Sequence, residues 1–235
     1  KKSMIPKIIH YCWFGRGKLP RLTRKCIKSW KNKLPDYELR IWNEDNFDIQ
    51  SSIPYVKEAY AKGKYAFVSD YVRLYALYNY GGIYLDTDVE VLKSLDVFLQ
   101  HNSFMGWEDS EKLSTAIIGT QSHCQWIGEV LDLYSSRKFI REDGSLDMTT
   151  NVVFITDYLK SNMRNEIVTI FPIDFFSPKS WSNGAYNVTD NTYTIHYFAG
   201  TWHSFAVRSL SKIFTNETVA NLAGIKERLQ KMIKR

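Results

Sequence analysis

The sequence predicts one α/β domain with a mostly parallel central sheet flanked by helices. Short apolar runs alternate along the chain with segments of helical periodicity, which is the pattern of strand–helix–strand units. Such alternation is typical of a parallel sheet covered by helices. The 235 residues contain no internal repeat, low-complexity segment or long linker. One domain over residues 1–235 is therefore the simplest organisation.

The expected strands are short apolar, β-prone runs; they cover residues 7–13, 37–42, 83–85, 103–107, 115–118, 167–171 and 193–198. The expected helices have apolar residues three or four positions apart, as Leu22, Cys26 and Trp30 illustrate. The other helices cover residues 54–63, 66–80, 125–134 and 149–159.

The stretch 66–92 organises the rest of the chain. Its helix ends at Gly81-Gly82, because glycine adopts the left-handed conformation of a helix C terminus without a steric penalty. A short apolar strand, 83–85, then leads directly into Asp86-Thr87-Asp88. In an extended chain alternate side chains share a face, so both carboxylates are expected to point the same way. Converging carboxylates repel each other unless a cation neutralises them, and Mn²⁺ or Mg²⁺ is the expected occupant.

The helix before the glycines contains a second charged pair. Asp70 and Arg73 are three positions apart and share one helix face. One interpretation is a solvated surface salt bridge, worth a few tenths of a kcal/mol. The other is that both side chains reach into the cleft beside Asp86 and Asp88.

This stretch resembles the D-x-D region of glycosyltransferase family 32, which is related to the clostridial large-toxin glucosyltransferase domains. The similarity runs from about residue 5 to about residue 205; the matching segments are 5–15, 66–70 with Arg73, 81–86 with Asp88, and 194–197 with Trp202. The resemblance implies the nucleotide-sugar fold called GT-A. The catalytic core then covers about 5–205, and residues 206–235 form a C-terminal helical extension.

The resemblance also implies metal ligands. Asp88 is the expected direct ligand of Mn²⁺ or Mg²⁺. Asp86 is expected to hold the ion through water or to hydrogen-bond the ribose and sugar hydroxyls. The family has a late metal ligand near His196, which makes this residue the third candidate. The alternative is that His196, within an apolar strand, is a hydrogen-bonded core residue.

The same resemblance implies nucleotide contacts. Trp13, Tyr65 and Ser69 match positions at which the related domains contact the nucleoside, with the Trp13 ring stacked on uracil. The local pattern alone favours another interpretation, in which Trp13 is a core residue that ends the first strand.

Donor-sugar contacts are implied for three further residues. Asp70 and Arg73 match positions that grip the sugar hydroxyls, and with Asp86 and Asp88 they complete the catalytic set. Asn151 is a candidate contact of the sugar or β-phosphate; alternatively it lies in the first turn of a helix.

The loop after Trp107 is open to two interpretations. Glu108 and Asp109 line the acceptor side of the site in one of them and form a plain polar loop in the other.

These residues suit the breaking of a bond between a sugar and a nucleotide diphosphate. Negative charge develops on the β-phosphate oxygen, and a divalent cation stabilises that charge. The resemblance implies retention at the anomeric carbon, from an α-linked UDP-sugar to an α-linked product. No second carboxylate is identifiable as a covalent nucleophile, so we expect front-face attack with the departing phosphate accepting the proton.

Composition restricts the partners. The net charge is +6, which favours an anionic partner such as a nucleotide-sugar diphosphate. No zinc-finger or arginine–glycine pattern indicates nucleic acid. The three cysteines are scattered and predict free thiols in a reducing compartment. With no export signal or membrane-length apolar run, the expected location is the cytoplasm.

The C-terminal stretch 217–235 has an apolar stripe and a basic face. Such a helix packs on its own domain or attaches to an anionic inner leaflet, where lipid-linked acceptors lie. By resemblance, the acceptor is a glycan or lipid-linked saccharide in bacterial capsule or other surface-polysaccharide synthesis.

Two other function classes stay open at this point. The segment 86–89 also resembles the nucleophile loop of haloacid-dehalogenase-type phosphatases, although no later acidic pair completes their Mg²⁺ site. A non-catalytic carbohydrate-binding module would account for the 15% aromatic content. Release of UDP distinguishes a transferase from a phosphatase, and hydrolysis of a UDP-sugar excludes a binding module.

Overall fold

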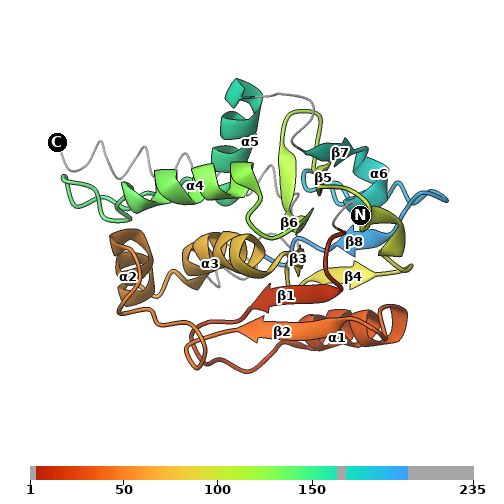
Figure 1. Ribbon diagram of the computed structural model, residues 1–235, viewed down its shortest axis with the longest axis horizontal. Helices are drawn as coiled ribbons and strands as arrows, with labels where there is room; N and C mark the ends of the chain where they lie inside the picture. The colour runs from red at the N-terminus through yellow and green to blue at the C-terminus, as the bar shows by residue number, and fades with distance from the viewer. Residues whose placement is uncertain (1–3, 163–167, 201–235) are drawn as a thin grey trace.

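The computed structural model describes residues 4–162 and 168–200, and a six-stranded mixed sheet forms its centre (Figure 1). The strand order is β2-β1-β3-β6-β5-β7. The bounds are Ile8–Cys12 for β1, Glu38–Trp42 for β2, Gly82–Leu85 for β3, Ser103–Trp107 for β5, Leu113–Thr120 for β6 and Thr169–Phe171 for β7. The pairs β1–β2, β1–β3 and β5–β7 are parallel, and β6 runs antiparallel to both β3 and β5. The carboxyl ends of β1, β3, β5 and β7 therefore lie at the same edge of the sheet.

Helices cover both faces of this sheet. Four pack their apolar residues into the core on one face: α2 (Pro54–Ala61), α3 (Tyr65–Tyr80), α4 (Gln125–Ser135) and α5 (Asn151–Asn162). The other face is covered by α1 (Arg21–Lys33), the 3₁₀ helix η1 (Asp96–Phe98), α6 (Ile173–Phe176) and a two-stranded sheet of β4 (Val89–Val91) and β8 (Thr194–His196).

Local sequence explains the main elements. Cys26 and Trp30 lie one turn apart on α1, and both are fully buried. The Trp30 indole N–H donates to the carbonyl of Val89, at 2.7 Å, which ties α1 to β4. Helix α3 ends at Gly81, whose φ is +63°. A Cβ there would lie 2.7 Å from the backbone nitrogen of Ser122, so both conformation and space require glycine.

The predicted α/β class is confirmed, and each predicted strand and helix overlaps one in the structure. Three short elements were missed: β4, η1 and α6. The predicted free thiols are confirmed for Cys12, Cys26 and Cys124. Within the six-stranded sheet three strand pairs are parallel and two antiparallel, and the two antiparallel pairs, both made by β6, make the sheet mixed.

The predicted C-terminal extension, 206–235, and Trp202 lie outside the described residues. The extent of the catalytic core and the membrane contact of the last helix therefore stay predictions. None of the described helices has the length and apolar character needed to cross a membrane.

Candidate functional site

The Asp86–Asp88 segment follows β3 at the carboxyl edge of the sheet. The expectation of an extended chain here is wrong, because the N–H of Val89 donates to the carbonyl of Asp86, at 3.0 Å, and closes a turn. The Asp86 N–H donates to the carbonyl of Ala116, at 2.8 Å, which holds the start of the turn on β6. The two carboxylates converge because the chain reverses, and not because alternate residues of a strand share a face.

The small sheet β4–β8 brings His196 to this turn. Val89 pairs with His196, so the last residue of β8 lies beside the end of the turn. His196 Nε2 lies 3.4 Å from Asp88 Oδ1, and the N–H of Ala199 donates to Asp88 Oδ2, at 2.7 Å. Asp86, Asp88 and His196 each offer one ligand atom, and these atoms lie within 4.8 Å of one another.

Charge and burial in this group suit a cation. Burial alone raises the pKa of Asp88, but the adjacent His196 and the N–H of Ala199 outweigh it and lower the pKa below its usual value. Burial lowers the pKa of His196, yet the carboxylates of Asp88, Glu108 and Asp86 raise it to about 9. His196 Nδ1 is buried and has no hydrogen-bond partner among the described residues. Two carboxylates and an imidazole are a donor set that fits a divalent ion such as Mn²⁺. A bound ion would replace the proton that the carboxylates hold on His196.

Arg73 links this group to α3. Its Nη2 lies 3.0 Å from Asp70 Oδ1 and 3.3 Å from Asp86 Oδ1. Its Nη1 donates to the carbonyl of Thr115, at 2.7 Å, and its guanidinium lies 4.5 Å from the centre of the Tyr84 ring. These contacts fix the Asp86 side chain against the end of the sheet.

Asp70 and Arg73 are only 8% and 5% exposed, so the surface salt-bridge interpretation is wrong. Burial raises the pKa of Asp70 to about 6, although Arg73 opposes the shift. Burial also disfavours charge on Arg73, but the carboxylates of Asp86 and Asp70 and the Tyr84 hydroxyl outweigh it and raise its pKa. The pair is therefore part of the interior beneath the acidic turn.

Asn151, at the start of α5, is bound to Asp70. Its N–H donates to Asp70 Oδ2, at 3.1 Å, and its side-chain amide donates to the Asp70 carbonyl, at 3.0 Å. The Tyr134 hydroxyl donates to Asn151 Oδ1, at 3.2 Å. Asn151 is 1% exposed and uses its polar atoms to hold Asp70; its contact with a donor sugar stays a prediction.

The three predicted nucleotide contacts lie around the carboxyl end of β1. Trp13 follows this strand, is half-buried, and donates from its indole N–H to the Gly17 carbonyl, at 2.6 Å. Tyr65 lies directly over Gly15, where a Cβ would be 2.2 Å from the Tyr65 ring. Ser69, one turn further along α3, donates to the carbonyl of Tyr65. The structure thus places all three near one another; their roles toward a nucleoside stay predictions.

Two further charged residues adjoin the site: Glu108, which one interpretation of the sequence put on the acceptor side, and Lys179, which the sequence did not single out. Burial raises the pKa of Glu108 to about 7, while His196 lowers it and Asp86 adds to the rise, so Glu108 lies within electrostatic range of both. Lys179 donates to the carbonyl of Tyr197, at 2.8 Å, and Asp88 affects its pKa, which burial lowers. Neither residue lies in a periodic segment. Only Glu108, directly after an apolar strand, has a sequence position that indicates a place near the site.

Comparisons with known proteins agree with this geometry. A family model described as "Glycosyltransferase sugar-binding region containing DXD motif" matches residues 20–105. An uncharacterized glycosyltransferase of Acanthamoeba polyphaga mimivirus is 30% identical over 224 residues, which cover 85% of this chain and 84% of that protein. Inositol phosphoceramide mannosyltransferase 3 of Schizosaccharomyces pombe is 31% identical over 122 residues, 51% of this chain. The match covers 34% of that relative's length.

The solved structure of the PaToxG glycosyltransferase shares the fold, with a TM-score of 0.54 and 21% identity over 68% of this chain and 70% of that chain. The predicted GT-A fold is thereby confirmed. The long match to the mimivirus protein and the DXD family model give the same assignment. The chain belongs to glycosyltransferase family 32, the sugar transferases with a DXD motif.

Proposed function

We propose that the chain moves a hexose from a UDP-sugar to a saccharide acceptor, with a divalent metal ion held by Asp86, Asp88 and His196. The observation that carries this proposal is the convergence of the three ligand groups beside Arg73, at the carboxyl edge of the sheet. Ligands of open α/β sheets bind at this edge. Membership of the family supports sugar transfer as the reaction class.

A bound Mn²⁺ or Mg²⁺ would act as a Lewis acid toward the diphosphate oxygens of the donor. The protein prepares the site for it in two ways. Arg73 and the Tyr84 hydroxyl both bind Asp86 Oδ1, at 3.3 Å and 2.9 Å, so this carboxylate is fixed before the donor arrives. The N–H of Ala199 fixes Asp88 in the same manner. Preorganised ligands need no reorganisation during the reaction.

We place the donor along the same edge. The base stacks on Trp13 near Tyr65 and Ser69, the diphosphate lies over Asp86 and Asp88, and the sugar lies over the Asp70–Arg73 pair. Asp70, Asp86 and Asp88 are each held by partners in the described structure, so none of these three carboxylates is free to act as a covalent nucleophile. We therefore infer retention by front-face attack, with the acceptor's proton passing to the leaving phosphate.

Lys179 supplies a second positive charge in this arrangement. Its ammonium group donates to the backbone carbonyl of Tyr197, next to His196, and forms no salt bridge with the described acidic residues. An ammonium group there is suited to the diphosphate that leaves.

The acceptor in this proposal is a glycan or lipid-linked saccharide. The S. pombe relative is named for inositol phosphoceramide, a lipid, which supports a lipid-linked acceptor here. We propose bacterial surface-polysaccharide synthesis at the cytoplasmic side of the membrane as the setting.

The test is release of UDP from UDP-glucose, UDP-galactose and UDP-N-acetylglucosamine without acceptor, with Mn²⁺ or Mg²⁺ and after EDTA. GDP-mannose, whose released nucleotide is GDP, is included because a relative is named as a mannosyltransferase. Release of GDP alone would refute a UDP-sugar as the donor. We expect metal-dependent UDP release, and Asp88→Asn should lower it on the order of a thousandfold, because metal stabilisation is worth several kcal/mol. The melting temperature without metal should change little. Full activity of Asp88→Asn, or release of inorganic phosphate in place of UDP, would refute the proposal.

A further inference from the structure

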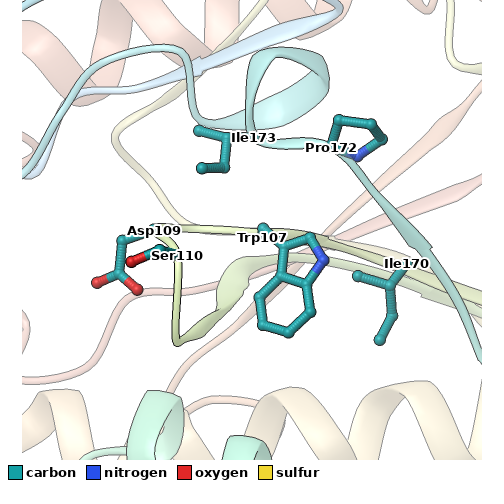
Figure 2. Close-up of a pocket in the computed structure, with 6 residues that line it drawn as sticks. All are labelled: Trp107, Asp109, Ser110, Ile170, Pro172 and Ile173. Carbon is teal, nitrogen blue, oxygen red and sulfur yellow. The ribbon is translucent and has the colours of Figure 1, made fainter.

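A second concave site lies on the carboxyl edge of the sheet, two strands from β3. It is a shallow cavity, open to solvent, with a volume of about 380 Å³. It lies between the β5–β6 turn and the start of α6 (Figure 2). Six residues line it: Trp107, Asp109, Ser110, Ile170, Pro172 and Ile173.

The lining combines an aromatic ring with free polar groups. Trp107 is half-buried and packs against the core, so its ring is held in place as one wall. Asp109 Oδ1 accepts the N–H groups of Glu111 and Lys112, both at 2.8 Å, which fixes the turn. Asp109 Oδ2 has no hydrogen-bond partner among the described residues, and Ser110 is exposed. Ile173, across the cavity, is 38% exposed and adds apolar surface.

This combination matches a pyranose ring. A sugar ring has C–H groups on its faces and hydroxyls around its rim. The face of an indole carries negative partial charge and attracts such C–H groups, while a carboxylate oxygen accepts from the hydroxyls. An anionic ligand is disfavoured by Asp109, and a purely apolar one leaves Asp109 and Ser110 without partners.

The position of the cavity assigns it to the acceptor. Trp13 follows β1, Asp86 follows β3, and Trp107 and Pro172 follow β5 and β7 along one edge. The proposed function puts the nucleotide on the β1 side of the acidic turn, which leaves the β5–β7 side for the acceptor. Strand β6 connects the two places: Ala116 accepts the N–H of Asp86, and Leu113, three residues earlier on the same strand, pairs with Trp107. At about 3.3 Å per residue, Trp107 and Asp86 lie roughly 10 Å apart along the strand.

We propose that this cavity is the acceptor subsite, in which a pyranose ring of the acceptor stacks on Trp107 and hydrogen-bonds to Asp109. The inference rests on the proposed function and adds the acceptor's class and place. Asp109 and Trp107 then act on acceptor binding alone.

The test measures two rates on the full chain with Mn²⁺ and its best donor: UDP release to water, and transfer to methyl and n-octyl glycosides of glucose, galactose and mannose. Trp107→Ala and Asp109→Asn should each raise the acceptor KM by about tenfold or more, since a hydrogen bond to a charged group or a stacked ring is lost. Release to water should stay within twofold. Trp107→Phe, which keeps an aromatic face, should recover most of the transfer.

Asp109→Asn keeps the Oδ1 acceptor that holds the turn, so it is expected to fold. Asp143→Asn is the matched control, because Asp143 Oδ1 also accepts a turn N–H, that of Ser145, but lies outside the cavity lining. It should alter neither rate.

Four results would overturn the inference: unchanged acceptor KM in both variants, an equal loss of hydrolysis and transfer, a loss seen only with octyl glycosides, or no transfer by the wild type to any glycoside. The third would assign the cavity to the acceptor's apolar tail. Absence of metal-dependent UDP release from the wild type is a different failure, because it refutes the proposed function itself.

Discussion

Two buried ion pairs meet at the carboxyl edge of the sheet, and the protein holds them in different ways. Arg73 has several partners at once: the carboxylates of Asp70 and Asp86 and the carbonyls of Ser69 and Thr115. His196 faces Asp88 with one nitrogen, at 3.4 Å, and its other nitrogen has no partner in the described chain. The Arg73 pair lies on the main sheet and α3, whereas the His196 pair depends on two three-residue strands.

The difference indicates that the Arg73 pair stabilises the fold, whereas the Asp88–His196 pair serves to bind a ligand. A fully satisfied buried network rigidifies its surroundings, and removing one charge from it is strongly destabilising. A buried polar atom without a partner costs stability, and a bound ion or ligand is one way to account for it. We therefore expect changes at Arg73 to unfold the protein and changes at Asp88 to remove activity from a folded one.

The largest expected effect tests this separation directly. Arg73→Met leaves the buried Asp70 without a counter-charge, next to the partly exposed Asp86, and should lower the free energy of unfolding by about 3–5 kcal/mol. Urea denaturation measures it. Arg16→Met is the matched control, because the Arg16–Asp45 pair is 63% and 66% exposed and should contribute less than about 1 kcal/mol. Equal losses in the two variants, or a comparable loss in Asp88→Asn, would remove the distinction between the pairs.

The same contrast explains which parts of the site could be predicted from the sequence. Asp70 and Arg73 share a helix face, and Gly81-Gly82 and the strand after them lie within a few positions, so local spacing places all of these groups. Spacing could not tell that the pair is buried, because burial comes from α5 and β6, which supply Asn151 and Thr115.

The Asp88–His196 contact had no local signal. It depends on β4, a strand of three residues that periodicity cannot detect, and on the pairing of β4 with β8. The N–H that also binds Asp88 comes from Ala199, 111 positions away. Only the family resemblance indicated His196. The turn at 86–89 was also missed, since a D-T-D segment is compatible with either an extended or a reversed chain. Glu108 and Lys179 approach the site from loops, where no period constrains the position of a side chain.

His10 offers a second test of the idea that polar groups inside the main sheet serve stability. It lies on β1, 0% exposed, with Nε2 2.8 Å from the Gly81 carbonyl, and Trp42 donates to its Nδ1, at 3.1 Å. This pattern requires a neutral ring that donates from Nε2. Burial lowers the pKa of His10 from 6.5 to about 4; the Gly81 carbonyl opposes the shift, and on β2 Arg40 adds to it while Glu38 opposes it.

The sign of the pH effect follows. The unfolded chain protonates this histidine near pH 6.5 and the folded chain near pH 4, so the unfolded state binds more protons between these values. The His10 contribution is complete above pH 6.5 and is lost as the pH falls toward 4, by up to about 3 kcal/mol. Urea denaturation of the wild type and of His10→Gln at pH 7, 6 and 5 isolates it. The two pH slopes should differ; identical slopes would show that His10 is not held neutral.

The smallest expected effect concerns Lys179, which lies beside the Asp88–His196 pair. Lys179 donates to the carbonyl of Tyr197, beside His196, so Lys179→Gln should remove one charge-assisted contact with the leaving diphosphate. UDP release should fall about tenfold in kcat, since such a contact is worth roughly 1.5–3 kcal/mol, while the melting temperature stays unchanged. Lys93 is the matched control. Lys179 lies 5.8 Å from the centre of the Tyr197 ring, and Lys93 lies 5.3 Å from the centre of the Tyr193 ring and donates to a backbone carbonyl, that of Asp190. Lys93→Gln removes the same kind of contact without reaching the acidic turn. Equal kcat in both variants would therefore show that Lys179 does not contact the leaving diphosphate. A lower melting temperature in Lys179→Gln alone would show that Lys179 is a structural residue.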